Sequence, residues 1–288
     1  IIESEKKKKT STKTDITELK DYPKFLLKRD CNITDLPSTS IFKTQYNGID
    51  YDFSLIKKKS DRLFILFNGD VPRDKLTLPV FQRWRWADKF DGSVLYVSDP
   101  SLNLSDSLGL AWYSGTPEFD PLEFISKIAN KVAKSTGAND IISYGSSGGG
   151  FASLRLSLFI ENLTSIAINP QTSIFKYKNF EMRGRYFRAC YPGLNNNEIE
   201  ENYSNRLNLL SHSAQLKSKK IIYVQNTLDI HHFHEHMKPF YNSLGVDNID
   251  NNIKGQLSTI LFSDPRGHSA AEDQLVFNSI INTLRTRS

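Results

Sequence analysis

The 288-residue chain lacks any apolar run of the roughly 20 residues that a membrane-spanning helix needs. No secretory pattern of charged and apolar residues opens it either. It has only two cysteines, Cys31 and Cys190, which cannot build a disulfide framework and have no CxxC spacing for metal or redox chemistry. These absences predict a cytoplasmic protein without a membrane span.

A strong charge of either sign is also lacking, with 37 Lys and Arg against 32 Asp and Glu, and part of the basic excess lies in the KKKK run at residues 6–9. No sustained basic stripe with interleaved aromatics is present, so we expect no nucleic-acid partner. Residues 1–16 are polar and rich in lysine, which predicts a flexible arm. Residues 17–288 have no internal repeat and no Pro/Gly-rich linker, which favours a single domain.

From about residue 41 onward, short apolar runs bounded by Gly, Asn, Asp and Pro alternate with segments of helical period. This alternation predicts an α/β fold in which helices flank a mostly parallel central sheet. The expected strands are residues 62–68, 93–97, 140–144, 165–169, 220–225 and 257–262. The expected helices are residues 121–135, 149–160, 197–210, 233–243 and 270–285.

A G-x-S-x-G motif, from Gly145 to Gly149 with Ser147 at its centre, lies where a predicted strand passes into a predicted helix. Such a turn strains the backbone of the serine, needs small neighbours and exposes the hydroxyl group, as in the nucleophile elbow of α/β-hydrolases. Ser147 is therefore the candidate nucleophile. The alternative is a glycine-rich phosphate cradle, but the Walker Lys-Ser/Thr and the G-x-G-x-x-G spacing are both missing.

A serine hydroxyl needs a base, and the base needs a third group to orient it. In α/β-hydrolases the acid and then the histidine follow the serine, each after a late strand. Asp229 follows the strand at 220–225, and His268 follows the strand at 257–262. We therefore expect a triad of Ser147, Asp229 and His268, with a helical insertion at about 171–218 covering it. Singly, Asp229 is also a common helix-capping residue, and His268 an ordinary loop histidine.

An oxyanion hole needs two backbone N–H groups, usually one after the nucleophile and one from the loop after an earlier strand. Gly148 is the candidate for the first. The Asn-Gly-Asp turn after the strand at 62–68 offers Gly69 or Asp70 for the second.

Four histidines crowd the segment HHFHEH at residues 231–236 and raise the question of a zinc site. The only other histidines are His212 and His268, and no cysteine lies nearby, so we expect no metal. The preferred interpretation is the start of a helix beside Asp229, with His232 lining the substrate pocket.

Two tryptophans, Trp84 and Trp112, are candidates for stacking on a sugar ring. Three arginines are candidates for binding an anionic polymer, namely Arg183, Arg185 and Arg188. The alternatives are that the tryptophans pack in the core and that the arginines are solvated.

At these positions the chain resembles the bacterial capsule polysaccharide O-acetyltransferases of the meningococcal serogroup A type, which have the α/β-hydrolase fold. The likeness lies in the GSSGGGFASL elbow, the INPQ segment at 168–171, the DIHH turn at 229–232, and Gly267-His268 with Glu272 soon after. The resemblance implies transfer of acetyl from acetyl-CoA, through acetyl-Ser147, to a hydroxyl of a capsular or surface polysaccharide. Acetyl-CoA would be a donor substrate, and no bound cofactor is implied.

The chain departs from that family in a longer N-terminal segment and a longer stretch between Asp229 and His268. A carbohydrate esterase or deacetylase with the same triad is the alternative within catalysis, because a triad does not distinguish water from a sugar hydroxyl. A non-catalytic module that binds polysaccharide or a partner is the third interpretation. A homo-oligomer or a capsule-biosynthesis partner remains open.

Overall fold

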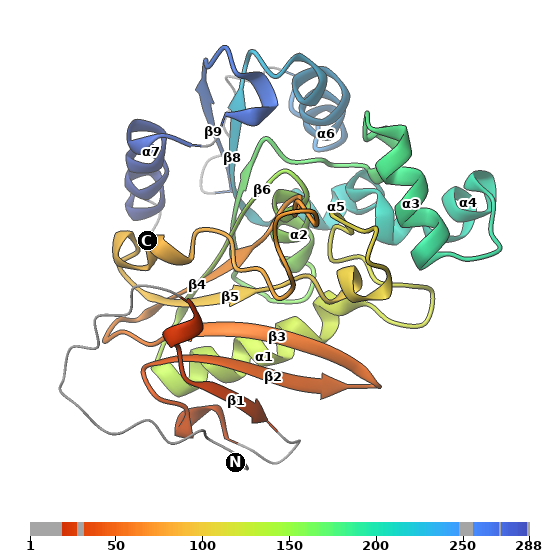
Figure 1. The fold of residues 1–288 in the computed structure, drawn as a ribbon. Coiled ribbons are helices and arrows are strands. Elements are labelled where there is room, and N and C mark those ends of the chain that lie inside the picture. Colours follow the sequence, from red (N-terminus) through yellow and green to blue (C-terminus); the bar gives the residue numbers. More distant parts are fainter. Residues whose placement is uncertain (1–18, 28–31, 248–255, 271, 287–288) are drawn as a thin grey trace.

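The computed structural model describes residues 19–27, 32–247, 256–270 and 272–286. The predicted arm at residues 1–16 and Cys31 lie outside the described residues. Within them, one sheet of nine strands runs through the molecule in the order β1-β2-β3-β5-β4-β6-β7-β8-β9 (Figure 1). From β5 through β4 to β9, all neighbouring strands are parallel, whereas β2, β3 and β5 pair antiparallel.

The strands are β1 (Lys24–Leu27), β2 (Thr39–Tyr46), β3 (Ile49–Ile56), β4 (Arg62–Phe67), β5 (Ser93–Val97), β6 (Asp140–Ser146), β7 (Thr164–Ile168), β8 (Lys220–Asn226) and β9 (Leu257–Phe262). The six predicted strands are confirmed as β4 to β9, with ends that differ by two residues at most. Strands β1, β2 and β3, which extend the sheet at one edge, were not among the predicted strands. The antiparallel pair β2 and β3 is joined by a two-residue turn in which Asn47 and Gly48 both have positive φ.

The helices are α1 (Pro121–Thr136), α2 (Gly148–Leu156), α3 (Phe180–Cys190), α4 (Asn196–Leu207), α5 (Ser213–Leu216), α6 (Lys238–Ser243) and α7 (Gln274–Arg285). All five predicted helical segments contain helix, but four differ from expectation, and the segment predicted at 197–210 ends as an α-helix at Leu207. In the segment predicted at 149–160, helix α2 already ends at Leu156. In the segment predicted at 270–285, helix α7 begins only at Gln274, with Asp273 as its N-cap. The segment at 233–243 consists of a π-helical turn, η7 (His232–Met237), followed by α6.

The predicted insertion at 171–218 contains α3, α4 and α5 together with two short 3₁₀ turns, η5 (Ile174–Lys176) and η6 (Leu209–His212). Its longest helix, α4, begins with a capping box in which Asn195 and Glu198 satisfy each other's backbone amides. Among the helices that the structure describes, none has the length and apolar composition of a membrane span.

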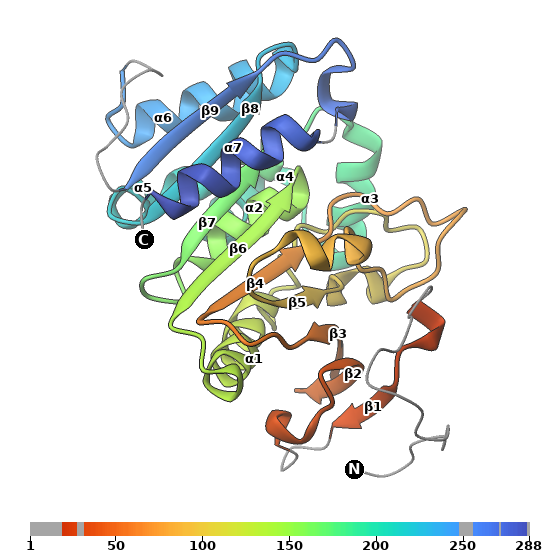
Figure 2. The same cartoon turned by 90° about the vertical axis from the view of Figure 1, so that its left-hand side faces the viewer.

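Helices cover both faces of the sheet, with α7 on one face and α1, α2 and α6 on the other (Figure 2). Successive residues of a strand point to opposite faces, and β6 shows the consequence. Ile142 and Tyr144 pack in the cluster that includes Phe277 of α7, while Ser143 bonds to Ser153 of α2 on the other side. The sheet is thus buried on both faces, as the apolar runs predicted.

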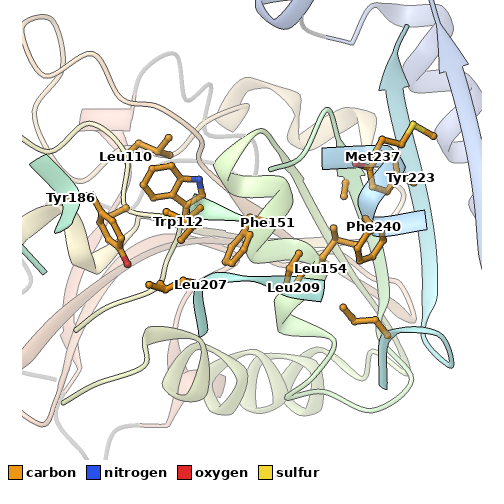
Figure 3. Packing of buried hydrophobic residues seen from close by; sticks show 14 of the residues in the cluster. Leu110, Trp112, Phe151, Leu154, Tyr186, Leu207, Leu209, Tyr223, Met237 and Phe240 are labelled. Atoms are coloured by element: carbon orange, nitrogen blue, oxygen red, sulfur yellow. The ribbon is translucent and has the colours of Figure 1, made fainter. Parts of the chain in front are cut away.

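Helix α2 is the most buried helix, and every one of its nine residues is buried. Its Phe151 and Leu154 pack among Trp112, Leu209 and Phe240, which come from three different segments (Figure 3). Because α2 begins directly after Ser147, this packing fixes the place of the candidate nucleophile.

Candidate active site

The turn between β6 and α2 holds Ser147 in a strained conformation, with φ 57° and ψ −119°. Only glycine fits on either side of it. A Cβ atom at position 145 would overlap the carbonyl group of Gly149, and one at position 149 would come within 2.8 Å of the Phe67 carbonyl oxygen. The Ser147 amide donates to the Ile168 carbonyl oxygen at 2.9 Å, which ties the turn to β7. This is the sharp strand-to-helix turn that the motif predicts.

Three side chains that are far apart in the sequence form a hydrogen-bonded chain at this turn. Nε2 of His268 lies 2.9 Å from Oγ of Ser147, and its Nδ1 lies 2.6 Å from Oδ2 of Asp229. Asp229 comes from the turn after β8, and His268 from the 3₁₀ turn η8 (Gly267–Ser269) after β9. The structure therefore brings Ser147, His268 and Asp229 together in the geometry of a nucleophile, a base and an orienting acid.

The side chain of Asn226 holds the loop that carries His268 in place. Asn226, the last residue of β8, donates its side-chain amide to the carbonyl oxygens of Asp264 and Gly267, both at 2.9 Å. The backbone N–H of Asn226 in turn donates to Oδ1 of Asn169 at 2.7 Å. The His268 loop is thus fastened to the ends of β7 and β8.

The Asp229 carboxylate also accepts a hydrogen bond from a second histidine. Nδ1 of His232 lies 3.0 Å from Oδ1 of Asp229, and the His232 ring stacks on the His268 ring with 3.8 Å between centroids and 6° between planes. Burial alone would raise the pKa of Asp229, but the hydrogen bonds from His232 and His268 outweigh it and hold that pKa well below its ordinary value. Burial lowers the pKa of His232 to about 4, so this ring is neutral at neutral pH.

Gln171, which the sequence analysis placed in the INPQ segment without a role, contacts the nucleophile. Its Nε2 lies 2.9 Å from Ser147 Oγ and 2.7 Å from His232 Nε2, while its Oε1 accepts from Trp112 Nε1 at 3.1 Å. The residue follows β7 at the carboxyl end of the sheet, as Asp229 and His268 follow β8 and β9. That shared placement was the sequence signal for it.

Both predicted oxyanion groups lie at the turn. The Gly148 amide opens α2, and the first amides of a helix have no acceptor within the helix. Gly69 lies close to Ser147, since a Cβ atom added to it would be 3.7 Å from the Ser147 Cβ. The Gly69 amide, however, donates to Oε1 of Gln82 at 2.9 Å. The Gly69 amide is therefore already paired in this structure.

The predicted sugar-contacting residues occupy other environments. Trp112 and His232 are fully buried, so neither has an open face for a sugar ring, and both instead hold Gln171. Trp84 lies in the 3₁₀ helix η3 (Trp84–Lys89), where its ring packs edge-on against Tyr22, with Arg85 over its face. These observations favour the packing alternative for both tryptophans.

The rings of His231, His232 and His236 lie near one another, with centroids 4.9–5.5 Å apart, but their nitrogens face different partners. Nε2 of His231 lies 3.0 Å from the Lys176 carbonyl oxygen, and Nδ1 of His236 accepts from the Thr172 amide at 3.1 Å. Within the described part of the chain, potential metal-binding atoms do come together at Asp229, His232 and His268, all within 4.8 Å of one another. The two Nδ1–carboxylate hydrogen bonds account for this convergence.

A buried ion pair that the sequence analysis missed lies behind the elbow. Arg83 Nε is 2.7 Å from Oε1 of Glu272, and Arg83 Nη2 donates to Ser146 Oγ at 2.9 Å. Tyr144 OH donates to the same Glu272 oxygen at 2.7 Å. Burial disfavours the charge on Glu272, but Arg83 outweighs it and lowers the pKa of that carboxyl. The pair joins the elbow to the segment that follows His268.

A strained serine between a parallel strand and a buried helix, with an acid and a histidine after the next strands in chain order, is the arrangement of the α/β-hydrolase fold. The chain has this fold, as predicted.

Among solved structures, the chain is similar to the capsule O-acetyltransferase of Neisseria meningitidis serogroup A, with 19% identity and a TM-score of 0.58 over 84% of this chain and 95% of that one. A histidine-to-alanine variant of that enzyme in complex with CoA has 21% identity and a TM-score of 0.59, covering 90% and 97% of the two chains. An acetyl xylan esterase from Paenibacillus sp. R4 has 14% identity and a TM-score of 0.52, covering 88% and 85%. No protein-family model and no curated protein matches the sequence. At these identities the likeness is one of fold.

Proposed function

We propose that this protein is a serine-dependent O-acetyltransferase that moves acetyl from acetyl-CoA to a hydroxyl of a bacterial capsular or surface polysaccharide. The observation that carries the proposal is the hydrogen-bonded chain from Ser147 Oγ through His268 to Asp229. The similarity to a capsule O-acetyltransferase with a CoA-bound structure supports the choice of donor and acceptor.

In the first half-reaction, Ser147 Oγ attacks the thioester carbonyl carbon and its proton passes to Nε2 of His268. The C–S bond then breaks, the thiolate takes the proton, and acetyl-Ser147 remains. In the second, a sugar hydroxyl gives its proton to His268 and attacks the acetyl carbon. The C–Oγ bond breaks, and Oγ recovers the proton from His268.

The ionised Asp229 stabilises the imidazolium that forms in each half-reaction. The Gly148 amide, and the Gly69 amide after Gln82 releases it, would bind the oxyanion of the tetrahedral intermediates. A cytoplasmic location is part of the proposal, because an acetyl-CoA donor and a buried free thiol at Cys190 fit a reducing compartment.

The test is intact-protein mass spectrometry after incubation with acetyl-CoA. The unmodified protein is expected to gain one acetyl group, and Ser147→Ala is expected to gain none. Ser146→Ala is the matched control, since it removes the neighbouring hydroxyl and should keep the adduct. An adduct that survives in Ser147→Ala would reject Ser147 as the nucleophile.

A serine esterase acting on acetylated carbohydrate is the second candidate, and the similarity to an acetyl xylan esterase favours it. It predicts Ser147-dependent hydrolysis of a small acetyl ester without an adduct from acetyl-CoA. If neither reaction occurs and a serine-directed fluorophosphonate fails to label the folded protein, a binding module is the remaining interpretation.

A further inference from the structure

The Gln171 side chain is fully buried between the candidate nucleophile and two other buried side chains. Both of its polar atoms lie near Ser147 Oγ, with Nε2 at 2.9 Å and Oε1 at 3.3 Å. Which of the two atoms forms the hydrogen bond to Ser147 depends on how the amide group is oriented. The hydrogen-bonding partners of Gln171 determine this orientation.

Trp112 defines the oxygen end of the amide. An indole N–H can only donate a hydrogen bond, and Trp112 Nε1 lies 3.1 Å from Gln171 Oε1. The reverse orientation would place an NH₂ group against the indole N–H, and both buried donors would lose an acceptor.

His232 defines the nitrogen end independently. The ionised Asp229 carboxylate only accepts, so Nδ1 of His232, 3.0 Å away, must carry a hydrogen. The ring is buried and neutral, which leaves Nε2 as an acceptor. The Gln171 atom 2.7 Å from this Nε2 must therefore be the NH₂ group.

The neutral form of His268 follows from the same carboxylate. Because the other Asp229 oxygen accepts from its Nδ1, its Nε2 is left to accept the Ser147 hydroxyl hydrogen. One carboxylate thus sets the tautomer of two stacked imidazoles. One ring receives the serine proton, and the other holds the amide that faces the serine oxygen.

We propose that Gln171 is a catalytic residue that donates an N–H to Ser147 Oγ and stabilises the negative charge on this oxygen while its bond to the acyl carbon forms and breaks. His232 is a positioning residue that acts by orienting Gln171. The reaction step rests on the proposed function, whereas the amide orientation does not.

The reason is the change in charge during the reaction. Oγ is more negative in the transition state, as its proton moves to His268, than it is in the hydroxyl or in the acyl ester. A fixed N–H donor therefore binds the transition state more strongly than either ground state. The amide accepts no proton and forms no covalent bond, so the proton balance of both half-reactions is unchanged.

The test uses Gln171→Met, which keeps the length of the side chain and removes the donor. The measurement is the rate at which a fluorophosphonate labels Ser147, since this probe needs an activated serine but no acetyl donor. We expect labelling to slow on the order of ten- to a hundredfold, the effect of losing one hydrogen bond to a charged group. Gln225→Met is the matched control, because Gln225 is equally buried and is expected to keep the unmodified rate.

Labelling of Gln171→Met at the unmodified rate would overturn the inference while leaving Ser147 as nucleophile. If the unmodified protein is labelled but takes no acetyl from acetyl-CoA, the proposed transferase fails and the labelling rates still decide the role of Gln171. If the unmodified protein is not labelled at all, both proposals are rejected.

The positioning role of His232 is tested with His232→Phe, which keeps a ring against His268 but loses both hydrogen bonds. If His232 acts through Gln171, the double variant with Gln171→Met should label no more slowly than Gln171→Met alone. For acetyl-CoA turnover, kcat should fall in each variant while KM stays the same. Multiplicative rate losses in the double variant would overturn the positioning role.

Discussion

Asp229 accepts a hydrogen bond from a different histidine at each oxygen, from His268 at Oδ2 and from His232 at Oδ1. Only an ionised carboxylate offers acceptors on both sides. An asparagine has one acceptor oxygen and one donor group, so one of the two histidines would have to turn or change its tautomer. The pairing of His268 with Ser147 therefore depends on a carboxylate at position 229.

The corresponding prediction concerns Asp229→Asn. We expect the rate of Ser147 labelling by a fluorophosphonate to fall by about 10³- to 10⁴-fold with the fold retained, as when a triad acid is neutralised. Asp50→Asn is the control, because this half-exposed carboxylate lies on β3 and pairs with Lys43. A loss below about tenfold would mean that Asp229 does not set the tautomer of His268.

The buried pair of Arg83 and Glu272 gives a prediction about stability. Glu272→Gln leaves the Arg83 charge without its partner, which should reduce the free energy of unfolding by about 3–5 kcal/mol. The measurement is the denaturant midpoint. Replacing both residues by apolar ones should recover most of that loss, and an additive loss would contradict the argument. Glu181→Gln breaks an exposed pair with Arg185 and should change stability by less than about 1 kcal/mol.

At the scale of elements, the same substitution of glycine by alanine should have opposite effects in the turn between β6 and α2 and inside α3. Gly145→Ala would place a methyl group on the Gly149 carbonyl, so it should cost about 3 kcal/mol of stability and abolish labelling of Ser147. Gly184→Ala, inside α3, faces only the flexible end of Arg188 and should add about 0.5–1 kcal/mol. Thermal unfolding of both variants checks the signs. Equal effects would show that the turn tolerates a side chain.

The strands that the sequence predicts are those buried on both faces. Runs such as RLFILF and SVLYV are apolar throughout because helices cover both sides of the sheet. In β2 and β3, polar residues interrupt the apolar ones, and no continuous run stands out. The Asn47-Gly48 pair between them is a strong signal for a two-residue hairpin, and it was the evidence that could have revealed both strands.

The site was predictable where it follows from strand order. Ser147, Asp229 and His268 each lie just after a strand, and parallel neighbours bring the ends of those strands to one edge of the sheet. Contacts between side chains do not follow from that order. Arg83 and Glu272 are 189 residues apart, and no pattern in the sequence marks them as partners. The contacts of Gln171 likewise depend on the packing of Trp112 and His232.

At the scale of the whole molecule, buried neutral histidines make stability depend on pH. Burial lowers the pKa of His232 to about 4 and holds the pKa of His236 well below its ordinary value, whereas an unfolded histidine titrates near 6.5. Between about pH 6.5 and about pH 4, the unfolded chain binds protons that the folded chain excludes. The contribution of these histidines to the free energy of unfolding is therefore fully present above about pH 6.5 and is lost as the pH falls toward about 4. Below about pH 4.3 the lowered carboxyl pKa values of Asp229 and Glu272 add to the loss.

The prediction is a steep fall in the free energy of unfolding between about pH 6.5 and about pH 5. Each buried histidine should contribute up to about 1.4 kcal/mol per pH unit. His236→Gln, which keeps an acceptor for the Thr172 amide, should reduce the slope by about that amount. Denaturant unfolding across the range measures it. An unchanged slope would indicate that His236 is protonated in the folded protein.

The long sequence separation between Ser147 and His268 has one more consequence. It joins residues 121 positions apart, and its members stand at the ends of β6 and β9, with β7 and β8 between them. No fragment lacking one of these strands can assemble the group. The fraction of protein that a covalent serine probe labels would thus report the fraction that is correctly folded, because a chain with any of the four strands misplaced would not react.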